Sequence, residues 1–202
     1  WVLFVGFVLP HPPYIAPPDL YRSYADAPFD LPPQWRAEDR PNHPTLDYFR
    51  RFFDFDSQFP EPTIRRLIAA YYGCCTYLDA QIGEVLDAID ACGIAGTTAV
   101  VYTSDHGEDL GARGLFGKFT MYEESVAVPM ILRGPGVPAG RRVGTPVSLV
   151  DLYPTITEIF HCSRSEDDEL PGESLIPIAR QPDRDRLVFS EYHAVGSRRV
   201  FF

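Results

Sequence analysis

The chain has 202 residues, of which 45% are hydrophobic and 23% are charged, and 28 acidic against 18 basic residues give a net charge of -10. These are values of an ordinary globular domain with enough apolar residues for a sizeable core. The acidic balance argues against a nucleic-acid partner, which needs a basic patch, and no apolar run approaches the about 18 residues of a membrane span.

The first nine residues, Trp1–Leu9, are apolar at almost every position and predict a strand buried on both faces. Five prolines in the next nine residues, PHPPYIAPP, exclude regular structure because proline removes a backbone donor and fixes φ. The region from Asp19 to about Pro62 is rich in proline, aspartate and aromatic residues. It predicts a long irregular loop, of the kind that is functional or mobile.

The strongest helical signal begins at Pro62 and ends at Gly93, with apolar residues repeating about every 3.6 positions between them. A second buried strand is expected at Thr97–Thr103. A strand, a long connection with a helix and a second strand are typical of a parallel crossover.

Three shorter elements follow: a strand at Val126–Leu132, a helix at Asp151–Phe160 with Pro154 in its first turn, and a strand at Arg186–Glu191. The order of these elements predicts an α/β fold, in which a mixed, mostly parallel sheet lies between helices.

The four cysteines are Cys74, Cys75, Cys92 and Cys162. They have neither zinc-site spacing nor the geometry of a disulfide framework. We expect buried or half-buried thiols in a reducing compartment, and a cytoplasmic location for the protein.

The candidate site lies where the second strand ends, on Asp105, His106 and Gly107. Ligands of open α/β sheets bind beyond the carboxyl ends of the strands, and a carboxylate beside an imidazole is a natural pair of ligands for a divalent metal. The first strand also ends, after one proline, on a histidine, His11. Alone, His11 is compatible with a turn histidine and Asp105 with a helix N-cap, but two such strand ends together predict a site.

Lys118 lies downstream in the glycine-rich stretch GARGLFGK. A lysine there can place its charge on a substrate oxyanion or donate to a leaving group, although a lysine taken alone is more often a solvated surface residue. A P-loop is excluded, because Ala112 stands at its first glycine and Phe119 at its Ser/Thr position. The G-x-S-x-G motif of serine hydrolases is absent.

The stretch YTSDHGEDLGARGLFGKFTMYEESVAVPMILRGPG resembles the carboxyl-side signature of the sulfatase family, within the alkaline-phosphatase-like superfamily. FVLPHPPYIAPP, YYGCCTYLDAQIGEVLDAI and VSLVDLYPTITEI resemble its flanking blocks in the same order. SEYH is similar to the carboxyl-terminal piece of the branch that contains choline-sulfatase-like enzymes and phosphonate monoester hydrolases. The resemblance implies an alkaline-phosphatase-like fold, with residues 1–160 as the carboxyl-side portion of the catalytic domain and residues 161–202 as a C-terminal subdomain segment.

The resemblance also implies roles for four residues. Asp105 and His106 match two ligands of one divalent metal ion, for which calcium is preferred and manganese or magnesium are alternatives. Lys118 matches the lysine that contacts the sulfate and assists departure of the leaving group. His11 matches the histidine at the leaving-group oxygen, a candidate general acid.

The family's nucleophile is a formylglycine made from Cys or Ser in C/S-x-P-x-R, and no cysteine or serine of this chain begins that pattern. The amino-terminal Asp-Asp pair of the metal site is also missing. We expect both upstream of Trp1, so that the chain is an incomplete domain, carries part of an active site and is inactive alone.

The resemblance implies metal-dependent hydrolysis of sulfate monoesters, a small anionic ester as substrate, and a homo-oligomeric full-length protein. A phosphonate monoester or phosphodiester hydrolase of the same superfamily is an alternative. A non-catalytic relative that binds an anion or a partner is a second, which the intact set of His11, Asp105, His106 and Lys118 disfavours. For the organic part of the substrate, the loop aromatics Tyr21, Tyr24, Phe29 and Trp35 suggest a cage for a quaternary ammonium.

Overall fold

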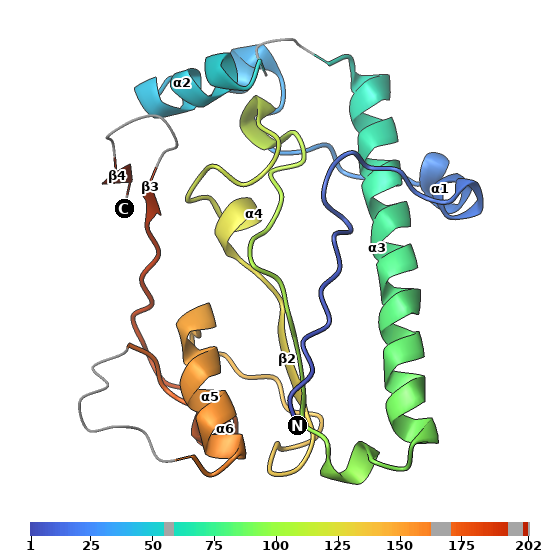
Figure 1. The fold of residues 1–202 in the computed structure, drawn as a ribbon. Coiled ribbons are helices and arrows are strands. Elements are labelled where there is room, and N and C mark those ends of the chain that lie inside the picture. The colour runs from blue at the N-terminus through green and yellow to red at the C-terminus, as the bar shows by residue number, and fades with distance from the viewer. Residues whose placement is uncertain (55–58, 163–170, 194–199, 202) are drawn as a thin grey trace. The chain divides into compact units, whose positions relative to one another are not determined.

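The computed structural model describes residues 1–54, 59–162, 171–193 and 200–201, and Figure 1 shows the course of the chain. The chain divides into two compact units, which are treated separately. The first unit holds Trp1–Ala88 and His106–Ala127, and the second holds Ile89–Asp105 and Val128–Phe202. None of the described helices has the length and apolar character needed to cross a membrane.

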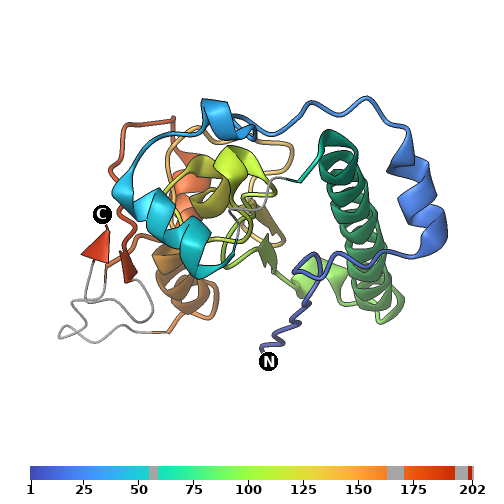
Figure 2. The same cartoon turned by 90° about the horizontal axis from the view of Figure 1, so that it is seen from above.

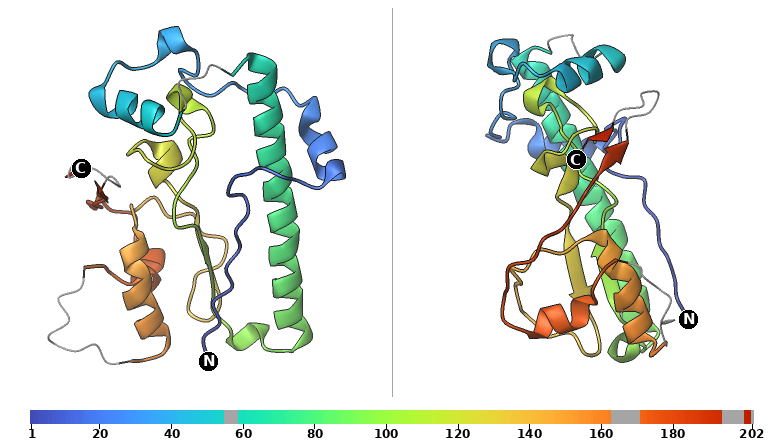
Figure 3. Two further views of the ribbon diagram at one scale, coloured as in Figure 1. Left: turned by 45° about the horizontal axis from the view of Figure 1, so that its top comes forward. Right: turned by 90° about the vertical axis from the view of Figure 1, so that its left-hand side faces the viewer.

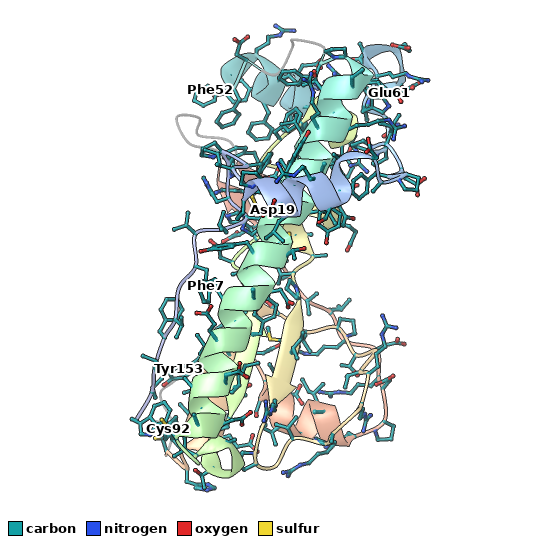
Figure 4. All side chains as sticks on the ribbon, turned by 90° about the vertical axis from the view of Figure 1, so that its right-hand side faces the viewer. Phe7, Asp19, Phe52, Glu61, Cys92 and Tyr153 are labelled. Atoms are coloured by element: carbon teal, nitrogen blue, oxygen red, sulfur yellow. The ribbon has the colours of Figure 1, made fainter. Side chains whose placement is uncertain are left out.

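The longest helix is α3, Glu61–Ala91, which confirms the helix predicted between Pro62 and Gly93. Its buried residues all lie in its first half, among them Ile64, Ile68 and Cys74. Figure 4 shows helix α1, marked there by Asp19, lying across α3. Gly73 permits this close approach, because a Cβ at that position would lie 2.8 Å from the Cβ of Ala16.

The irregular loop predicted between Asp19 and Pro62 is wrong in part, because it contains helices. Helix α1 spans Pro18–Ala25 and α2 spans Pro44–Phe52. In both, proline stands in the first turn, where its missing N–H costs nothing and its fixed φ suits the helix. Two of the prolines that signalled irregular structure in the sequence, Pro18 and Pro44, therefore mark helix starts.

The buried strand predicted at Trp1–Leu9 is not formed. The segment joins no described strand ladder, and Trp1, Phe4 and Val8 are 74%, 91% and 81% exposed. An apolar run becomes a buried strand only where a neighbouring strand takes its backbone hydrogen bonds and other elements cover its faces. Among the described residues this segment has no such partner strand.

The second unit contains an antiparallel pair of strands, β1 at Val100–Thr103 and β2 at Met130–Arg133, with Val101 opposite Leu132. The predicted parallel pairing of β1 with the first nine residues is therefore not present. Strand β2 is shorter than the strand predicted at Val126–Leu132, because helix α4, Glu123–Val126, takes up the first residue of that range. Pro129, which has no amide donor, precedes β2.

Helices α5, Leu152–Ile159, and α6, Leu175–Arg180, lie side by side in the second unit (Figure 3). Helix α5 confirms the predicted helix, with Pro154 in its first turn. The strand predicted at Arg186–Glu191 is wrong, because residues 182–191 have no regular structure and Leu187 is almost fully exposed. A short pair, β3 at Tyr192–His193 and β4 at Val200–Phe201, ends the chain.

Short 3-10 helices connect longer elements in the described part of the chain, at Ala37–Asp39, Ala95–Thr97, Ala112–Gly114 and Leu149–Asp151. All four cysteines are free thiols. Cys74 is buried and Cys75 half-buried, as predicted, whereas Cys92 and Cys162 are exposed.

Candidate active site

The site begins directly after β1, where Asp105 is exposed and His106 is half-buried. Nδ1 of His106 lies 2.8 Å from the carbonyl oxygen of Gly107. A carbonyl oxygen only accepts, so Nδ1 donates this hydrogen bond. Histidines that ligate a metal through one ring nitrogen commonly donate from the other in this way.

Gly107 makes the sharp turn after this histidine possible. A Cβ on Gly107 would lie 2.1 Å from the carbonyl oxygen of Glu124, so no other residue fits without moving the backbone. The amide of Gly107 donates to the carbonyl of Ser125 at 2.7 Å. The strand end is thus held directly against the segment that follows Lys118.

Two further backbone hydrogen bonds close the loop that carries Lys118. The amide of Glu108 donates to the carbonyl of Glu124, and the amide of Asp109 donates to the carbonyl of Gly117, each at 2.7 Å. Lys118 is half-buried at the end of this braced loop. These hydrogen bonds bring the loop of Lys118 against the strand end that carries His106. The sequence analysis assigns both residues to one site.

The carboxylate of Glu108 supports the same loop from inside. Its Oε1 accepts the amide of Leu110 at 2.9 Å and the amide of Gly117 at 2.6 Å. Tyr14 lies near this carboxylate: the pKa of its phenol is raised, first by burial and then by the negative charge of Glu108. The ring of Tyr14 packs edge-on against Tyr71, with 5.6 Å between the ring centroids.

Asp109 is the buried acid of the site, with only 3% of its surface exposed. One oxygen accepts the Thr120 hydroxyl at 3.3 Å, whereas the other has no hydrogen-bond partner among the described residues. The pKa of Asp109 is raised to about 7, first by burial and further by the charges of Glu108 and Glu124. The Thr120 hydrogen bond and the nearby Arg113 oppose this rise in the pKa.

Arg113 occupies the left-handed region with a φ of 55° and ties two parts of the loop together. Its guanidinium lies 3.7 Å from the centre of the Tyr122 ring, and its Nη1 lies 3.1 Å from Oε2 of Glu124. A cation placed over a ring and beside a carboxylate is held from two sides.

Helix α2 lies beside this loop, as Figure 2 shows. Arg50 on α2 is buried, and its Nε and Nη2 donate to the carbonyl oxygen of Arg113 at 3.2 and 3.1 Å. Its Nη1 donates to Asp47 at 2.8 Å. The helix thereby fixes the backbone of the strained turn that precedes Lys118.

A stack of aromatic rings makes the second contact between α2 and the loop. The ring of Phe119, next to Lys118, stacks on Phe53 at 4.1 Å with an interplanar angle of 20°. It also lies 6.1 Å from Phe49. These apolar contacts support the chain directly after Lys118, at Phe119, whereas the hydrogen bonds of Gly117 support it directly before Lys118.

His11, the fourth predicted residue, also belongs to the first unit. Its side chain is exposed, and Nδ1 lies 2.7 Å from the carbonyl of Pro12. The structure thus brings the Lys118 loop against the His106 strand end. It places Tyr14, three residues after His11, near Glu108. The side chain of His11 itself stays at the surface. Asp105 lies in the second unit and is joined to His106 by the chain itself.

The donor set fits a divalent cation in part. The carboxylate of Asp105 and the imidazole of His106 are suitable types of ligand. The described residues contain no group of three or more His, Cys, Asp or Glu side chains placed to hold a metal ion. These two residues can therefore supply part of a coordination shell.

Sequence reasoning missed the residues that hold the loop in shape. They are Glu108, Asp109, Arg113 and Glu124, together with Arg50 from α2. The signal that could have found them is charge: Glu108, Asp109 and Arg113 stand close together in a stretch rich in glycine and apolar residues, and Glu124 follows Lys118 closely. Charges in such a stretch need partners when the chain folds over them.

The rings suggested as an ammonium cage have other contacts in the structure. Phe29 packs on Tyr72 of α3 with 4.7 Å between centroids, and Tyr24 lies 5.6 Å from the same ring. The guanidinium of Arg36 lies 5.4 Å from the ring centre of Trp35. These contacts use the rings for packing and for an internal cation, which argues against the cage.

Residues 1–162 match the sequence model of the sulfatase family, described as Sulfatase. The match covers most of the chain and includes the braced loop with His106 and Lys118. The chain belongs to the sulfatase family.

Two curated relatives illustrate the range of the family. A choline-sulfatase of Rhizobium meliloti (strain 1021) is 33% identical over 202 residues, which cover 98% of this chain and 39% of that protein. Arylsulfatase K of Homo sapiens is 31% identical over 195 residues, which cover 90% of this chain and 35% of that protein. The chain spans less than two fifths of the length of these relatives.

Solved structures support the same assignment. The phosphonate monoester hydrolase SpPMH from Silicibacter pomeroyi has a TM-score of 0.73 and 31% identity, over 87% of this chain and 36% of that one. A sulfatase described as putative, yidJ from Bacteroides fragilis, has a TM-score of 0.64 and 27% identity, over 85% and 34%. These neighbours confirm the predicted α/β, alkaline-phosphatase-like fold class, present in this chain as part of a domain.

Proposed function

We propose that the protein containing this chain hydrolyses sulfate monoesters, and that this chain supplies part of the active site. The observation that carries the proposal is the braced loop, which holds Lys118 against the strand end of His106 in a chain of the sulfatase family. A lysine in this position places a fixed positive charge where a small anionic ester can bind.

Asp105 and His106 would hold a divalent cation, with calcium preferred and manganese or magnesium as alternatives. When bound, the ion would neutralise the negative charge of the sulfate group. The hydrogen bond from Nδ1 of His106 to Gly107 supports this role, because it holds the ring in one orientation.

Lys118 and His11 are assigned to the leaving group. As the ester bond breaks, negative charge grows on the departing oxygen, which Lys118 stabilises and His11 protonates as general acid. The exposed ring of His11 is accessible to a substrate. Its contact with the Pro12 carbonyl is made by Nδ1 and therefore does not involve Nε2. The nucleophile in this proposal is a formylglycine outside this chain, since no C/S-x-P-x-R pattern occurs in it.

The test uses the full-length protein. Peptide mass spectrometry first asks whether a C/S-x-P-x-R peptide carries an aldehyde, and 4-nitrophenyl sulfate then serves as substrate. We expect turnover that a chelator abolishes and an added divalent ion restores. Lys118→Ala should lower kcat by about 100-fold, the range of a lost acid or charge in the transition state. A full-length protein with the aldehyde but without sulfate ester turnover would contradict the proposal.

A second candidate is hydrolysis of phosphonate monoesters or phosphodiesters. It is favoured by the likeness to the Silicibacter pomeroyi phosphonate monoester hydrolase, at a TM-score of 0.73 and 31% identity. Turnover of 4-nitrophenyl phenylphosphonate beside that of the sulfate ester separates the two. A higher kcat/KM for the phosphonate assigns the protein to this second activity.

A further inference from the structure

Glu108 occupies an unusual position between the two parts of the site. Its own amide donates to the carbonyl of Glu124, which fixes its backbone on one side of the loop. Its Oε1 reaches across the loop and accepts the amides of Leu110 and Gly117 at 2.9 and 2.6 Å. The side chain therefore spans the loop that begins after His106 and ends at Lys118.

Gly117 is the residue on which this contact acts. Its amide is held by Glu108 Oε1, and its carbonyl oxygen accepts the amide of Asp109 at 2.7 Å. Its φ of 84° is one that residues with a side chain rarely adopt. With both of its polar groups bonded, this residue fixes the direction in which the chain enters Lys118.

The same carboxylate also lies near the segment of His11. The negative charge of Glu108 raises the pKa of Tyr14, which stands three residues after His11. Glu108 is thus linked to the three segments of the first unit that carry the predicted site residues His106, Lys118 and His11. Glu108, which links these three segments, is not one of the residues that the sequence analysis assigned to the site.

We propose that Glu108 is a positioning residue, which acts through the Gly117 peptide to hold Lys118 in register with His106. The inference rests on the proposed function, because it takes Lys118 to act on the leaving group. Glu108 itself touches no substrate in this account. Loss of its carboxylate would leave two amides without an acceptor and free the Gly117 peptide to rotate.

The chemistry of the contact selects the variants. Glutamine keeps a carbonyl oxygen at the same distance from the backbone and can accept both amides, so Glu108→Gln should retain the contact. Alanine removes the acceptor, and Glu108→Ala should lose it. Glu123→Ala is the matched control, because Glu123 is an exposed acid in the same loop region, at the start of α4.

The first measurement is amide hydrogen exchange on the full-length protein, which needs no activity. We expect the Gly117 and Leu110 amides to lose protection in Glu108→Ala and to keep it in Glu108→Gln and Glu123→Ala. Unchanged protection of Gly117 in Glu108→Ala would overturn the inference while leaving the proposed function intact. Metal content is measured on the same samples and should be unchanged.

The second measurement is a double-mutant cycle with Lys118, on phenyl sulfate and on 4-nitrophenyl sulfate. Phenol is the poorer leaving group and needs more assistance from Lys118. We expect Glu108→Ala to lower kcat about tenfold on phenyl sulfate and less on 4-nitrophenyl sulfate, with Glu108→Gln within about threefold of the unmodified protein. The variant Glu108→Ala/Lys118→Ala should be no slower than Lys118→Ala alone.

The outcomes separate the inference from the function on which it rests. Losses that multiply in the double variant, or a Glu108→Ala effect equal on both esters, mean that Glu108 acts other than through Lys118 and overturn the inference alone. An unaffected Lys118→Ala overturns the assigned role of the lysine, and with it this inference. A full-length protein with no sulfate ester turnover at all would refute the proposed function itself.

Discussion

Both carboxylate oxygens of Asp151 accept hydrogen bonds from the guanidinium of Arg186, each at 2.7 Å, across 35 residues of sequence. Asp151 is completely buried and also accepts the amides of Ser148 and Glu173, at 2.8 and 2.9 Å. Burial alone would raise the pKa of Asp151, but these four hydrogen bonds outweigh it and lower the pKa. The pair ties the segment after α6 to the start of α5.

The pair predicts a strong effect of Arg186→Gln on stability. The substitution leaves the Asp151 charge buried without its cation, which should lower the free energy of unfolding by about 3–5 kcal/mol. Because the pKa of Asp151 is lowered in the folded state, its contribution is present above the ordinary aspartate pKa and is lost as the pH falls below it. Urea denaturation at pH 7 measures the loss. The control is Arg184→Gln, which breaks an exposed pair with Glu173 and should cost less than about 1 kcal/mol.

Asp109 predicts the opposite dependence of stability on pH. Its folded pKa of about 7 lies above the unfolded value of about 3.9, so the folded state holds the proton more tightly. Stability should fall as the pH rises through the window from about 4 to about 7, by up to about 1.4 kcal/mol per pH unit. Asp109→Asn should flatten this part of the profile, measured by urea denaturation at half-unit steps. An unchanged profile in the variant would contradict this role of Asp109.

Gly107→Ala should destabilise the loop of Lys118. The added methyl group would lie 2.1 Å from the carbonyl oxygen of Glu124, and this contact can only be relieved by moving backbone. We expect a loss of several-fold in kcat and a lower Tm, because the shift separates the strand end from the loop. Gly83→Ala is the control: nothing lies within 4 Å of its Cβ position on α3, so a helix-favouring alanine should raise stability by about 0.5–1 kcal/mol. A neutral Gly107→Ala would mean that the loop has another conformation.

Arg50→Lys tests the connection from α2. The lysine ammonium cannot donate to the Arg113 carbonyl through two parallel N–H groups while also binding Asp47, as the guanidinium does. We expect a loss of about 1–3 kcal/mol in the free energy of unfolding and increased exchange of the amides between Leu110 and Gly114. The neighbouring Arg51 is exposed, and Arg51→Lys should change neither measurement. Equal behaviour of the two variants would argue against a role for Arg50 in fixing the turn.

The sequence predicted a helix best where the repeating pattern of apolar residues extends over many turns. The pattern from Ile64 to Ile89 covers many turns, and α3 and α5 formed where they were expected. The strand at Trp1–Leu9 was wrong because composition reports how apolar a segment is, whereas a strand also needs a neighbour to take its hydrogen bonds. The helices α1 and α2 were missed because proline reads as a breaker although it favours the first turn.

For the site, the sequence pointed to the side chains proposed for the chemistry but not to those that hold the loop in shape. Asp105, His106 and Lys118 stand out by residue type and position after a strand. Glu108 accepts a backbone amide 9 residues along the chain, and Arg50 donates to a carbonyl 63 residues away, so both contacts depend on a geometry that no periodic pattern reports. The roles of the four site residues, the boundary after residue 160, the homo-oligomer and the cytoplasmic location stay predictions.

The ring stack of Phe49, Phe53 and Phe119 has a consequence for how such a protein diversifies. Flat rings can slide and be exchanged for one another at small cost, whereas hydrogen bonds demand one geometry. The buried face of α2 is held to the loop of Lys118 by both kinds of contact, and its exposed face, with Tyr48 and Phe52, is held by neither Arg50 nor Phe119. Substitutions on that outer face can therefore accumulate while the loop of Lys118 keeps its place.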